Sequence, residues 1–177
     1  DNSANSIYEY FKEQHEFMSI PHDKKIVIEH YQENNKRYVV FHTLFGRRTN
    51  DVLSRAVAYA VSKISGRDVE IGLNDNGFYL STNKPIQARR AFNLLESEKL
   101  REVMKRALEK TEVLKRRFRH CAARALMILR RYKGREKSVG KQQVSSRMLL
   151  SAVRKIDEDF PILEEARREV LEDLMDI

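Results

Sequence analysis

The strand-like segments of this 177-residue chain all lie before Pro85, and every segment after that proline has helical periodicity. Before Pro85, two helical patterns alternate with two pairs of strand patterns. The first helical pattern covers 6–18, and the second follows residues 46–50 and runs to about residue 64. The strand patterns cover 25–31 and 37–45, then 67–73 and 78–82. This order predicts an α+β fold, with a small antiparallel sheet of about four strands and packed helices, followed by a helical lobe.

Two sequence details refine this expectation. The residues 74–77, Asn-Asp-Asn-Gly, are typical of a hairpin turn and would join the second pair of strands. Segment 37–45 is apolar on both faces, which favours a central strand. After Pro85 the helices are expected near 86–94, 97–108, 111–132, 142–156 and 161–174. We therefore expect an α+β lobe at 1–95 and a helical lobe at 96–177, packed together as one domain.

Charge is strongly segregated along the chain. The net charge is +8, and the segment from Lys99 to Arg147 holds 17 Lys and Arg residues against 4 Asp and Glu. The segment from Asp157 to Asp176 holds 9 acidic residues. Such segregation points to an anionic partner, unless the acidic tail itself covers part of the basic segment.

The expected helix at 111–132 carries much of this positive charge. At about 100° per residue, an apolar stripe that includes Leu114, Phe118 and Cys121 runs along it. Basic side chains line both flanks of the stripe, with Arg117, Arg124 and Arg131 on one and Lys115, Arg119 and Arg130 on the other. The pattern fits an amphipathic helix with a solvated basic rim. It equally fits a surface that follows phosphates, because the neighbouring sequence has few acids to pair these arginines.

The segment 132–143 is the second basic feature. Gly134 and Gly140 would let the backbone approach a ligand, and the cations around them are Lys133, Arg135, Lys137 and Lys141. Gln142 and Gln143 would begin the next helix, where free N–H groups favour anions and amide side chains can read base edges. The segment is either a nucleic-acid-binding loop or a mobile connection. It is not a nucleotide-binding P-loop, because five residues instead of four separate its glycines and Gln142 replaces the required Ser or Thr.

A third candidate lies where segment 37–45 leads into the next helix. Arg47 and Arg48 follow a glycine at the helix start, which would suit phosphate or sugar binding. Alternatively, Thr49 or Asn50 caps the helix, and Arg47 or Arg55 pairs with Asp51.

Other chemistry has little support in the sequence. The five histidines and single cysteine show no metal-ligand spacing, and Cys121 falls on an apolar stripe, so we expect no metal site and an unreactive thiol. Phe118 and Tyr132 are the only aromatic residues of the basic segment, which argues against a base-stacking platform there. No run of about 18 apolar residues exists, so no membrane span is expected. One cysteine suits a reducing cytoplasm.

Two stretches together resemble a known family. They are the run from His42 to Ala56 and the segment from Phe118 to Arg147, which includes Arg124–Arg130 and Tyr132–Arg135. Both are similar to the C-terminal, DEAD/H-associated region of the large helicase-related (Lhr) ATP-dependent helicases of prokaryotes. The resemblance implies a superfamily 2 motor, in which two RecA-like domains hydrolyse ATP with Mg²⁺. A winged helix and this further region would grip the nucleic acid. The chain itself has no P-loop or DEAD/DEAH box, so no cofactor is expected in it.

We therefore expect an accessory nucleic-acid-binding domain without catalytic residues. Its ligands would be single-stranded or duplex DNA, or RNA, and its protein partners the RecA-like motor and winged-helix domains. The alternative is an interaction scaffold that docks on the motor or on another repair factor. The candidate binding residues are Arg47, Arg48, Arg117, Arg119, Arg124, Arg131, Lys133, Arg135, Lys137, Lys141, Gln142 and Gln143.

Overall fold

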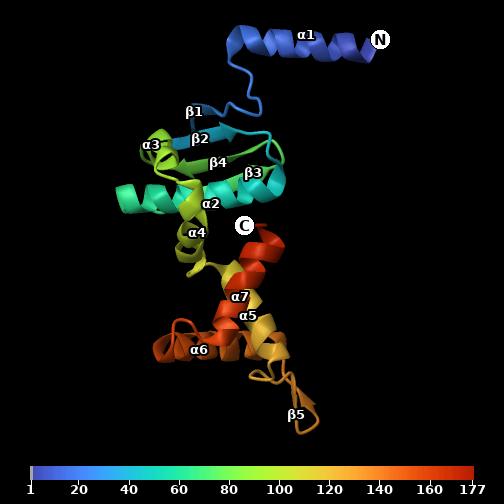
Figure 1. The fold of residues 1–177 in the computed structure, drawn as a ribbon, viewed down its shortest axis with the longest axis vertical. Helices are drawn as coiled ribbons and strands as arrows, with labels where there is room; N and C mark the ends of the chain where they lie inside the picture. Colours follow the sequence, from blue (N-terminus) through green and yellow to red (C-terminus); the bar gives the residue numbers. More distant parts are fainter. Residues whose placement is uncertain (1) are drawn as a thin grey trace. The chain divides into compact units, whose positions relative to one another are not determined.

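The computed structural model describes residues 2–177, which divide into two compact units, Asp1–Glu96 and Ser97–Ile177 (Figure 1). We call them unit 1 and unit 2. Unit 1 contains a four-stranded antiparallel sheet with helices, and unit 2 is mostly helical. The α+β class predicted from the sequence is confirmed.

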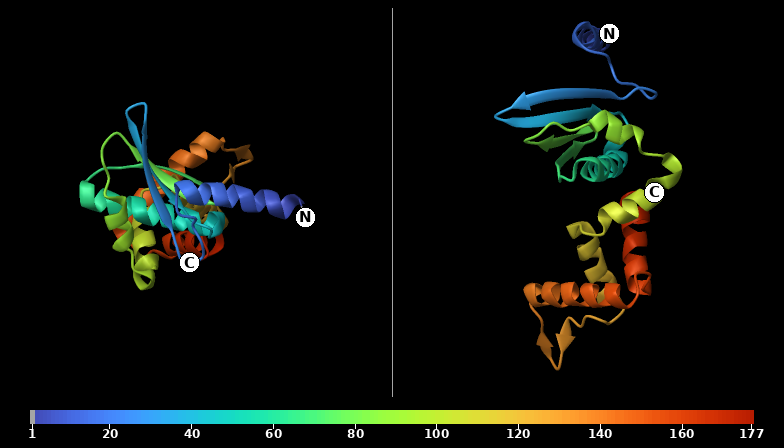
Figure 2. Two further views of the ribbon diagram at one scale, coloured as in Figure 1. Left: turned by 90° about the horizontal axis from the view of Figure 1, so that it is seen from above. Right: turned by 90° about the vertical axis from the view of Figure 1, so that its left-hand side faces the viewer.

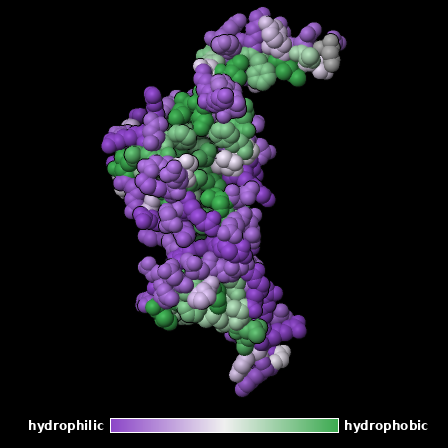
Figure 3. Space-filling model, in the orientation of Figure 1, coloured by the Kyte–Doolittle hydropathy of each residue, from purple (hydrophilic) through white to green (hydrophobic). Residues whose placement is uncertain are grey.

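Unit 1 begins with helix α1 (Asn2–Phe17). None of the residues of α1 is buried. Its apolar side chains, Ile7, Tyr10 and Phe11 among them, are exposed and form an apolar patch on its surface (Figure 3).

The sheet has the strand order β1-β2-β4-β3. Its strands are β1 (Val27–Glu33), β2 (Lys36–His42), β3 (Glu70–Asn74) and β4 (Gly77–Thr82). Strand β2 pairs with both β1 and β4, so it is central, as its apolar sequence predicted. The turn between β3 and β4 lies at the predicted Asn-Asp-Asn-Gly sequence, where the Asn76 backbone N–H donates to the Asn74 side chain at 2.9 Å.

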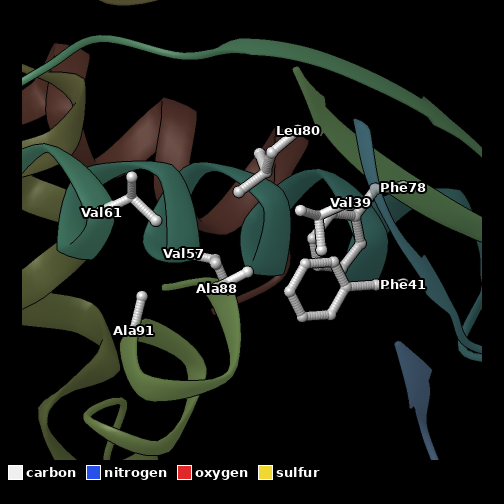
Figure 4. Close-up of a cluster of buried hydrophobic side chains, with 8 residues drawn as sticks. All are labelled: Val39, Phe41, Val57, Val61, Phe78, Leu80, Ala88 and Ala91. Carbon is white, nitrogen blue, oxygen red and sulfur yellow. The ribbon is translucent and has the colours of Figure 1, made fainter. Parts of the chain in front are cut away.

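One face of the sheet packs against helices α2 (Gly46–Ser65) and α3 (Ala88–Asn93), which gives unit 1 its core (Figures 2 and 4). Alternate residues of β2 and β4 point to this face because side chains alternate along a strand. Phe41 and Phe78 stack there with ring centroids 4.5 Å apart. Val57 and Val61 of α2 meet them, as the helical periodicity predicted.

The start of α2 differs from the sequence-based expectation. Neither Thr49 nor Asn50 caps it, because α2 already begins at Gly46. Asn50 is instead a residue of α2 itself, and its side chain is completely buried. The side-chain amide donates to the backbone carbonyls of Asn74 and Asp75 at 3.0 and 3.1 Å. An amide in this position satisfies two carbonyls of the β3–β4 turn and thereby fixes that turn to the helix.

Unit 2 is built around helix α5 (Glu112–Arg124), which contacts both α6 (Val139–Ile156) and α7 (Pro161–Arg168). A short 3₁₀ turn (Ser97–Lys99) and α4 (Leu100–Leu108) precede it. The core of unit 2 includes Met104, Leu114, Phe118, Leu150 and Leu163, which are all buried.

The prediction of one continuous helix over 111–132 is wrong for the second half of that range. Helix α5 ends at Arg124, and Leu126 adopts a positive φ of 57° that reverses the chain. The backbone N–H groups of Met127 and Ile128 both donate to Ala122 O, at 2.9 and 3.2 Å, which satisfies the end of the helix. Ile128 then returns to the core with 5% of its surface exposed.

A small β-hairpin occupies the rest of the expected helix. Its strands are β5 (Arg131–Tyr132) and β6 (Arg135–Glu136), joined by Lys133 and Gly134. Both turn residues have positive φ, 50° and 75°, which a two-residue hairpin turn requires and glycine favours. Gly134 therefore serves the turn, and a close approach of its backbone to a ligand stays a prediction.

The chain after α7 also departs from a regular helix. The expected helix at 161–174 is regular only to Arg168, and the segment Glu169–Leu174 continues as a wider π-helix. Pro161 lies in the first turn of α7, where a missing backbone N–H costs nothing. The π-helical segment contacts α4 and α5, so the acidic C-terminal region lies against the basic helix.

Candidate nucleic-acid interface

Helix α5 presents its basic side chains away from its buried stripe. Leu114, Phe118, Cys121 and Ala122 face the core of unit 2. The remaining positions are largely basic and line two open grooves, one toward α6 and one toward the C-terminal end of α5. Arg116 borders both grooves, so the two are adjacent.

The groove between α5 and α6, which we call the α5–α6 groove, has a volume of about 260 Å³. Arg116 and Arg119 of α5 line one side, and Gln143 and Arg147 of α6 line the other. Leu150 contributes an apolar wall. Glu112 and Lys115 also line the groove and pair with each other at 2.7 Å. The three guanidinium groups and the amide make the site rich in hydrogen-bond donors, which suits phosphate oxygens.

The second groove, which we call the α5 end groove, has a volume of about 700 Å³. Arg116, His120 and Arg124 of α5 line it together with Arg130, which precedes the hairpin. Partial burial and the charges of the neighbouring arginines, Arg119 foremost, lower the pKa of His120 below its usual 6.5. The imidazole is therefore mainly neutral at pH 7, in a groove whose other charged side chains are cationic.

Four arginines of these grooves are available to a ligand. Within residues 2–177, no carboxylate lies at ion-pair distance from Arg116, Arg119, Arg130 or Arg147. Guanidinium groups without protein partners bind phosphate without first breaking an existing ion pair. This distinguishes the four arginines from the other basic residues of α5.

Arg117 and Arg124 have a carboxylate partner that the local sequence does not reveal. Both guanidinium groups donate to the Glu169 carboxylate, and Arg117 Nη1 lies 3.1 Å from Glu169 Oε2. The Glu169 side chain is only 5% exposed. Burial raises the pKa of Glu169, but Arg124 and Arg117 together lower it below its ordinary value, so the carboxylate is ionised. The expectation that acids are scarce around these arginines is wrong, because the acid comes from a segment 45 residues further along the chain.

The other predicted residues of unit 2 lie on or beside the hairpin. Three of these residues, Arg131, Lys133 and Arg135, are exposed on the hairpin. Arg131 Nη2 lies 3.9 Å from Glu136 Oε2. Lys137 follows the hairpin and is half-buried. Helix α6 begins at Val139, earlier than expected, which places Lys141 and Gln142 in its first turn. The Gln142 side chain donates to the Lys137 carbonyl at 2.9 Å and thus fixes the chain between hairpin and helix.

Arg47 and Arg48 lie in the first turn of α2, in unit 1, and both are exposed. Arg55, and not Arg47, pairs with Asp51, with Nε and Oδ1 2.8 Å apart. Arg47 and Arg48 thus belong to unit 1, whereas both grooves belong to unit 2.

Sequence reasoning did not single out Arg116 or Arg147 as binding residues. On a helical wheel, Arg116 is one of several basic positions, and nothing in the local sequence of Arg147 ties it to α5. The packing of α6 on α5 brings the two arginines to one groove. The sequence placed Arg130 on a flank of the expected helix, but the groove that it shares with His120 depends on the chain reversal at Leu126.

Cys121 offers no reactive group. Burial, followed by the nearby Glu169 carboxylate, raises the pKa of its thiol to about 11, so it stays protonated at neutral pH. Across residues 2–177, no three His, Cys, Asp or Glu side chains come together in a way that could hold a metal ion. No helix in that part of the chain combines the length and the apolar character needed to cross a membrane.

Comparison with known proteins decides the family. The model of the family described as DEAD/H associated matches residues 20–177. The chain belongs to the DEAD/H-associated family. All of α1 precedes the match, so the DEAD/H-associated region comprises the sheet, its two helices and all of unit 2.

Relatives of this DEAD/H-associated chain include Lhr helicases. It is 55% identical to the ATP-dependent helicase Lhr-Core of Methanothermobacter thermautotrophicus over its whole length, which is 21% of that protein. It is 27% identical to the Lhr helicase/uracil glycosylase of Escherichia coli over 89% of the chain and 10% of that protein. The chain thus spans about a fifth of the length of the Lhr-Core relatives. The resemblance to Lhr helicases stated from the sequence is confirmed.

A solved structure agrees with this assignment. The structure of Mycobacterium smegmatis helicase Lhr bound to ssDNA and AMP-PNP matches with a TM-score of 0.75 and 28% sequence identity. The match covers 88% of this chain and 20% of the M. smegmatis chain.

Proposed function

We propose that this DEAD/H-associated domain is an accessory nucleic-acid-binding domain that grips the sugar-phosphate backbone of a strand along α5. The observation that carries the proposal is the pair of adjacent grooves lined by Arg116, Arg119, Arg130 and Arg147, four arginines without carboxylate partners. The ssDNA in the M. smegmatis Lhr structure supports a nucleic acid as the ligand.

The proposed contacts are to phosphate, and this determines the kind of recognition. Arginine–phosphate contacts fix the position of a strand but carry no base information. We therefore expect little sequence preference. Such low discrimination suits a grip on a strand that moves past the domain, since each new stretch of backbone presents the same phosphates.

ATP-driven translocation is not part of the role that we propose for this chain. By analogy with Lhr helicases, two RecA-like domains would bind ATP with Mg²⁺ and drive translocation, and a winged helix would share the grip. No residue of this chain is assigned to ATP hydrolysis, and the domain contributes only a hold on the strand.

A fluorescence-anisotropy titration tests this proposal. Labelled oligo(dT) and a mixed-sequence single strand of equal length should bind with similar affinity at low salt. Both affinities should fall steeply as salt rises, because phosphate binding releases condensed counterions. An affinity unchanged between low and moderate salt would contradict the proposal.

The position of His120 predicts a pH dependence of binding. Partial burial and the surrounding arginines lower the pKa of His120 in the free protein, and a phosphate in the α5 end groove would offset the arginine charges and raise it. Protonation of His120 would then favour the complex, so affinity should increase as the pH falls toward 6.5 and below. Titrations from pH 8 to pH 5.5 should show this increase for the native chain, and His120→Gln should remove it. An equal increase in both proteins would rule out His120 as its source.

Protein docking is a second candidate, and the outer face of the sheet in unit 1 favours it. Tyr31 and Tyr38 stack there with ring centroids 4.7 Å apart, and Tyr79 lies edge-on to Tyr38 at 5.8 Å. Tyr31 and Tyr79 are 44% and 40% exposed, and the carboxylates of Glu29 and Glu70 share this face and disfavour a polyanion there. Titration with isolated motor domains of an Lhr relative separates this candidate from the first.

A further inference from the structure

The β5–β6 hairpin protrudes from the helices of unit 2 (Figures 1 and 2). It carries one exposed aromatic side chain. Tyr132 is 56% exposed, whereas Phe118, the other aromatic residue of the basic segment, is completely buried. Tyr132 is therefore the one Phe or Tyr ring of the segment 99–147 that a ligand can reach.

The hairpin is anchored at both ends, which fixes the position of this ring. On one side, Ile128 is buried and its backbone N–H donates to Ala122 O of α5. On the other side, Lys137 N donates to Arg130 O at 2.9 Å, and Gln142 of α6 holds the Lys137 carbonyl. A short hairpin held by two helices loses little conformational freedom on binding, which favours recognition through its tip.

The hairpin follows the α5 end groove directly in the chain, because a groove-lining arginine is the residue before β5. Arg130 lies directly before β5 and lines the α5 end groove together with Arg116 and His120. A strand whose phosphates follow these cations therefore arrives at the hairpin. There, the Lys133 ammonium lies 5.5 Å from the centroid of the Tyr132 ring. An aromatic ring surrounded by cations combines base stacking with phosphate contacts, as single-strand-binding proteins do.

We propose that Tyr132 stacks on an unpaired base of the strand whose phosphates lie along α5. This inference rests on the proposed function and deepens it by naming single-stranded nucleic acid as the preferred ligand. In a continuous duplex both faces of each base are covered by its neighbours, so Tyr132 can stack only where a base is unpaired. One ring gives a single stacking contact and no base-specific hydrogen bond, so the preference is for strandedness and not for sequence.

Replacement of Tyr132 tests this proposal in the full chain. The probe is oligo(dT) with one 2-aminopurine, whose fluorescence is quenched when the base stacks on an aromatic ring. Tyr132→Ala should weaken single-strand binding about 5- to 150-fold, the loss expected for one aromatic–base stack, and should abolish the quenching. Tyr132→Phe should keep both, because the ring and not the hydroxyl makes the contact. Blunt duplex should bind Tyr132→Ala as it binds the native chain.

The control is Tyr8→Ala, which removes an equally accessible tyrosine from α1, where it is 64% exposed. If native binding is salt-dependent but Tyr132→Ala binds single strands as tightly as the control, the stacking proposal is wrong and the phosphate grip stands. An equal loss for single strand and duplex would also overturn it, because Tyr132 would then act without an unpaired base. If the native chain shows no salt-dependent binding at all, the proposed function itself fails.

Discussion

Replacement of Glu169 by alanine should lower the free energy of unfolding of unit 2 by about 3 kcal/mol, the lower end of the range for removing one partner of a buried ion pair. Glu169 is buried and accepts from both Arg117 and Arg124. Without it, two guanidinium groups would face each other with no anion between them. We place the effect at the lower end because the Arg124 side chain is 59% exposed and water can partly solvate it.

Urea unfolding of the full chain, followed by far-UV circular dichroism, measures this loss. Glu165→Ala is the matched control, because Glu165 lies on α7 and pairs with Arg168 at the surface, where both side chains are more than 40% exposed. Exposed pairs contribute about 0 to 1 kcal/mol, so the control should stay close to the native chain. An equally small loss for Glu169→Ala would show that the buried pair does not hold the C-terminal segment on α5.

The effect of Glu169 should also depend on pH. Because Arg124 and Arg117 lower its pKa in the folded chain, its contribution is present above the ordinary value of 4.5. It is lost as the pH falls through the lowered pKa. The stability difference between the native chain and Glu169→Ala should therefore shrink in acid.

Removal of three groove arginines should weaken single-strand binding about 1000-fold. Arg116→Ala, Arg119→Ala and Arg147→Ala together empty the α5–α6 groove of its guanidinium groups. A hydrogen bond to a charged group contributes about 1.5 kcal/mol, and each 1.4 kcal/mol changes Kd tenfold. None of the three has a carboxylate partner in the described chain, so the variant should unfold at nearly the same urea concentration as the native protein.

A second triple variant separates a specific site from a general loss of charge. Lys84→Ala, Arg89→Ala and Arg90→Ala remove the same number of positive charges from an exposed part of unit 1. Its Kd should change much less than that of the groove variant. If both variants lose affinity equally, binding follows net charge and the groove is not the site.

The sequence predicted most of the fold because its signals were local. The apolar character of β2 on both faces, the Asn-Asp-Asn-Gly turn and the periodicity of α2 are each signals within a short stretch of sequence. The end of α5 escaped prediction because the segment 125–132 keeps helical periodicity in its apolar residues. Its actual course depends on a left-handed Leu126 and on the return of Ile128 to the core, and both depend on tertiary packing.

The site was only partly predictable for the same physical reason. The charge excess between residues 99 and 147 directed attention to α5, which lines both grooves. Sequence alone could not separate arginines that hold the fold together from arginines that remain available. Glu169, far along the chain, neutralises Arg117 and Arg124, whereas Arg147 comes from α6 to join Arg116 and Arg119.

The most direct test of the account is the slope of log Kd against log salt for oligo(dT), measured for the native chain and for the variant that lacks Arg116, Arg119 and Arg147. Each phosphate neutralised on a single strand contributes about 0.7 to this slope. The account predicts a steep slope for the native chain and a slope smaller by about 2 for the variant, since three phosphate contacts are lost. Equal slopes for the two proteins would show that these arginines do not hold the strand and would contradict the central claim.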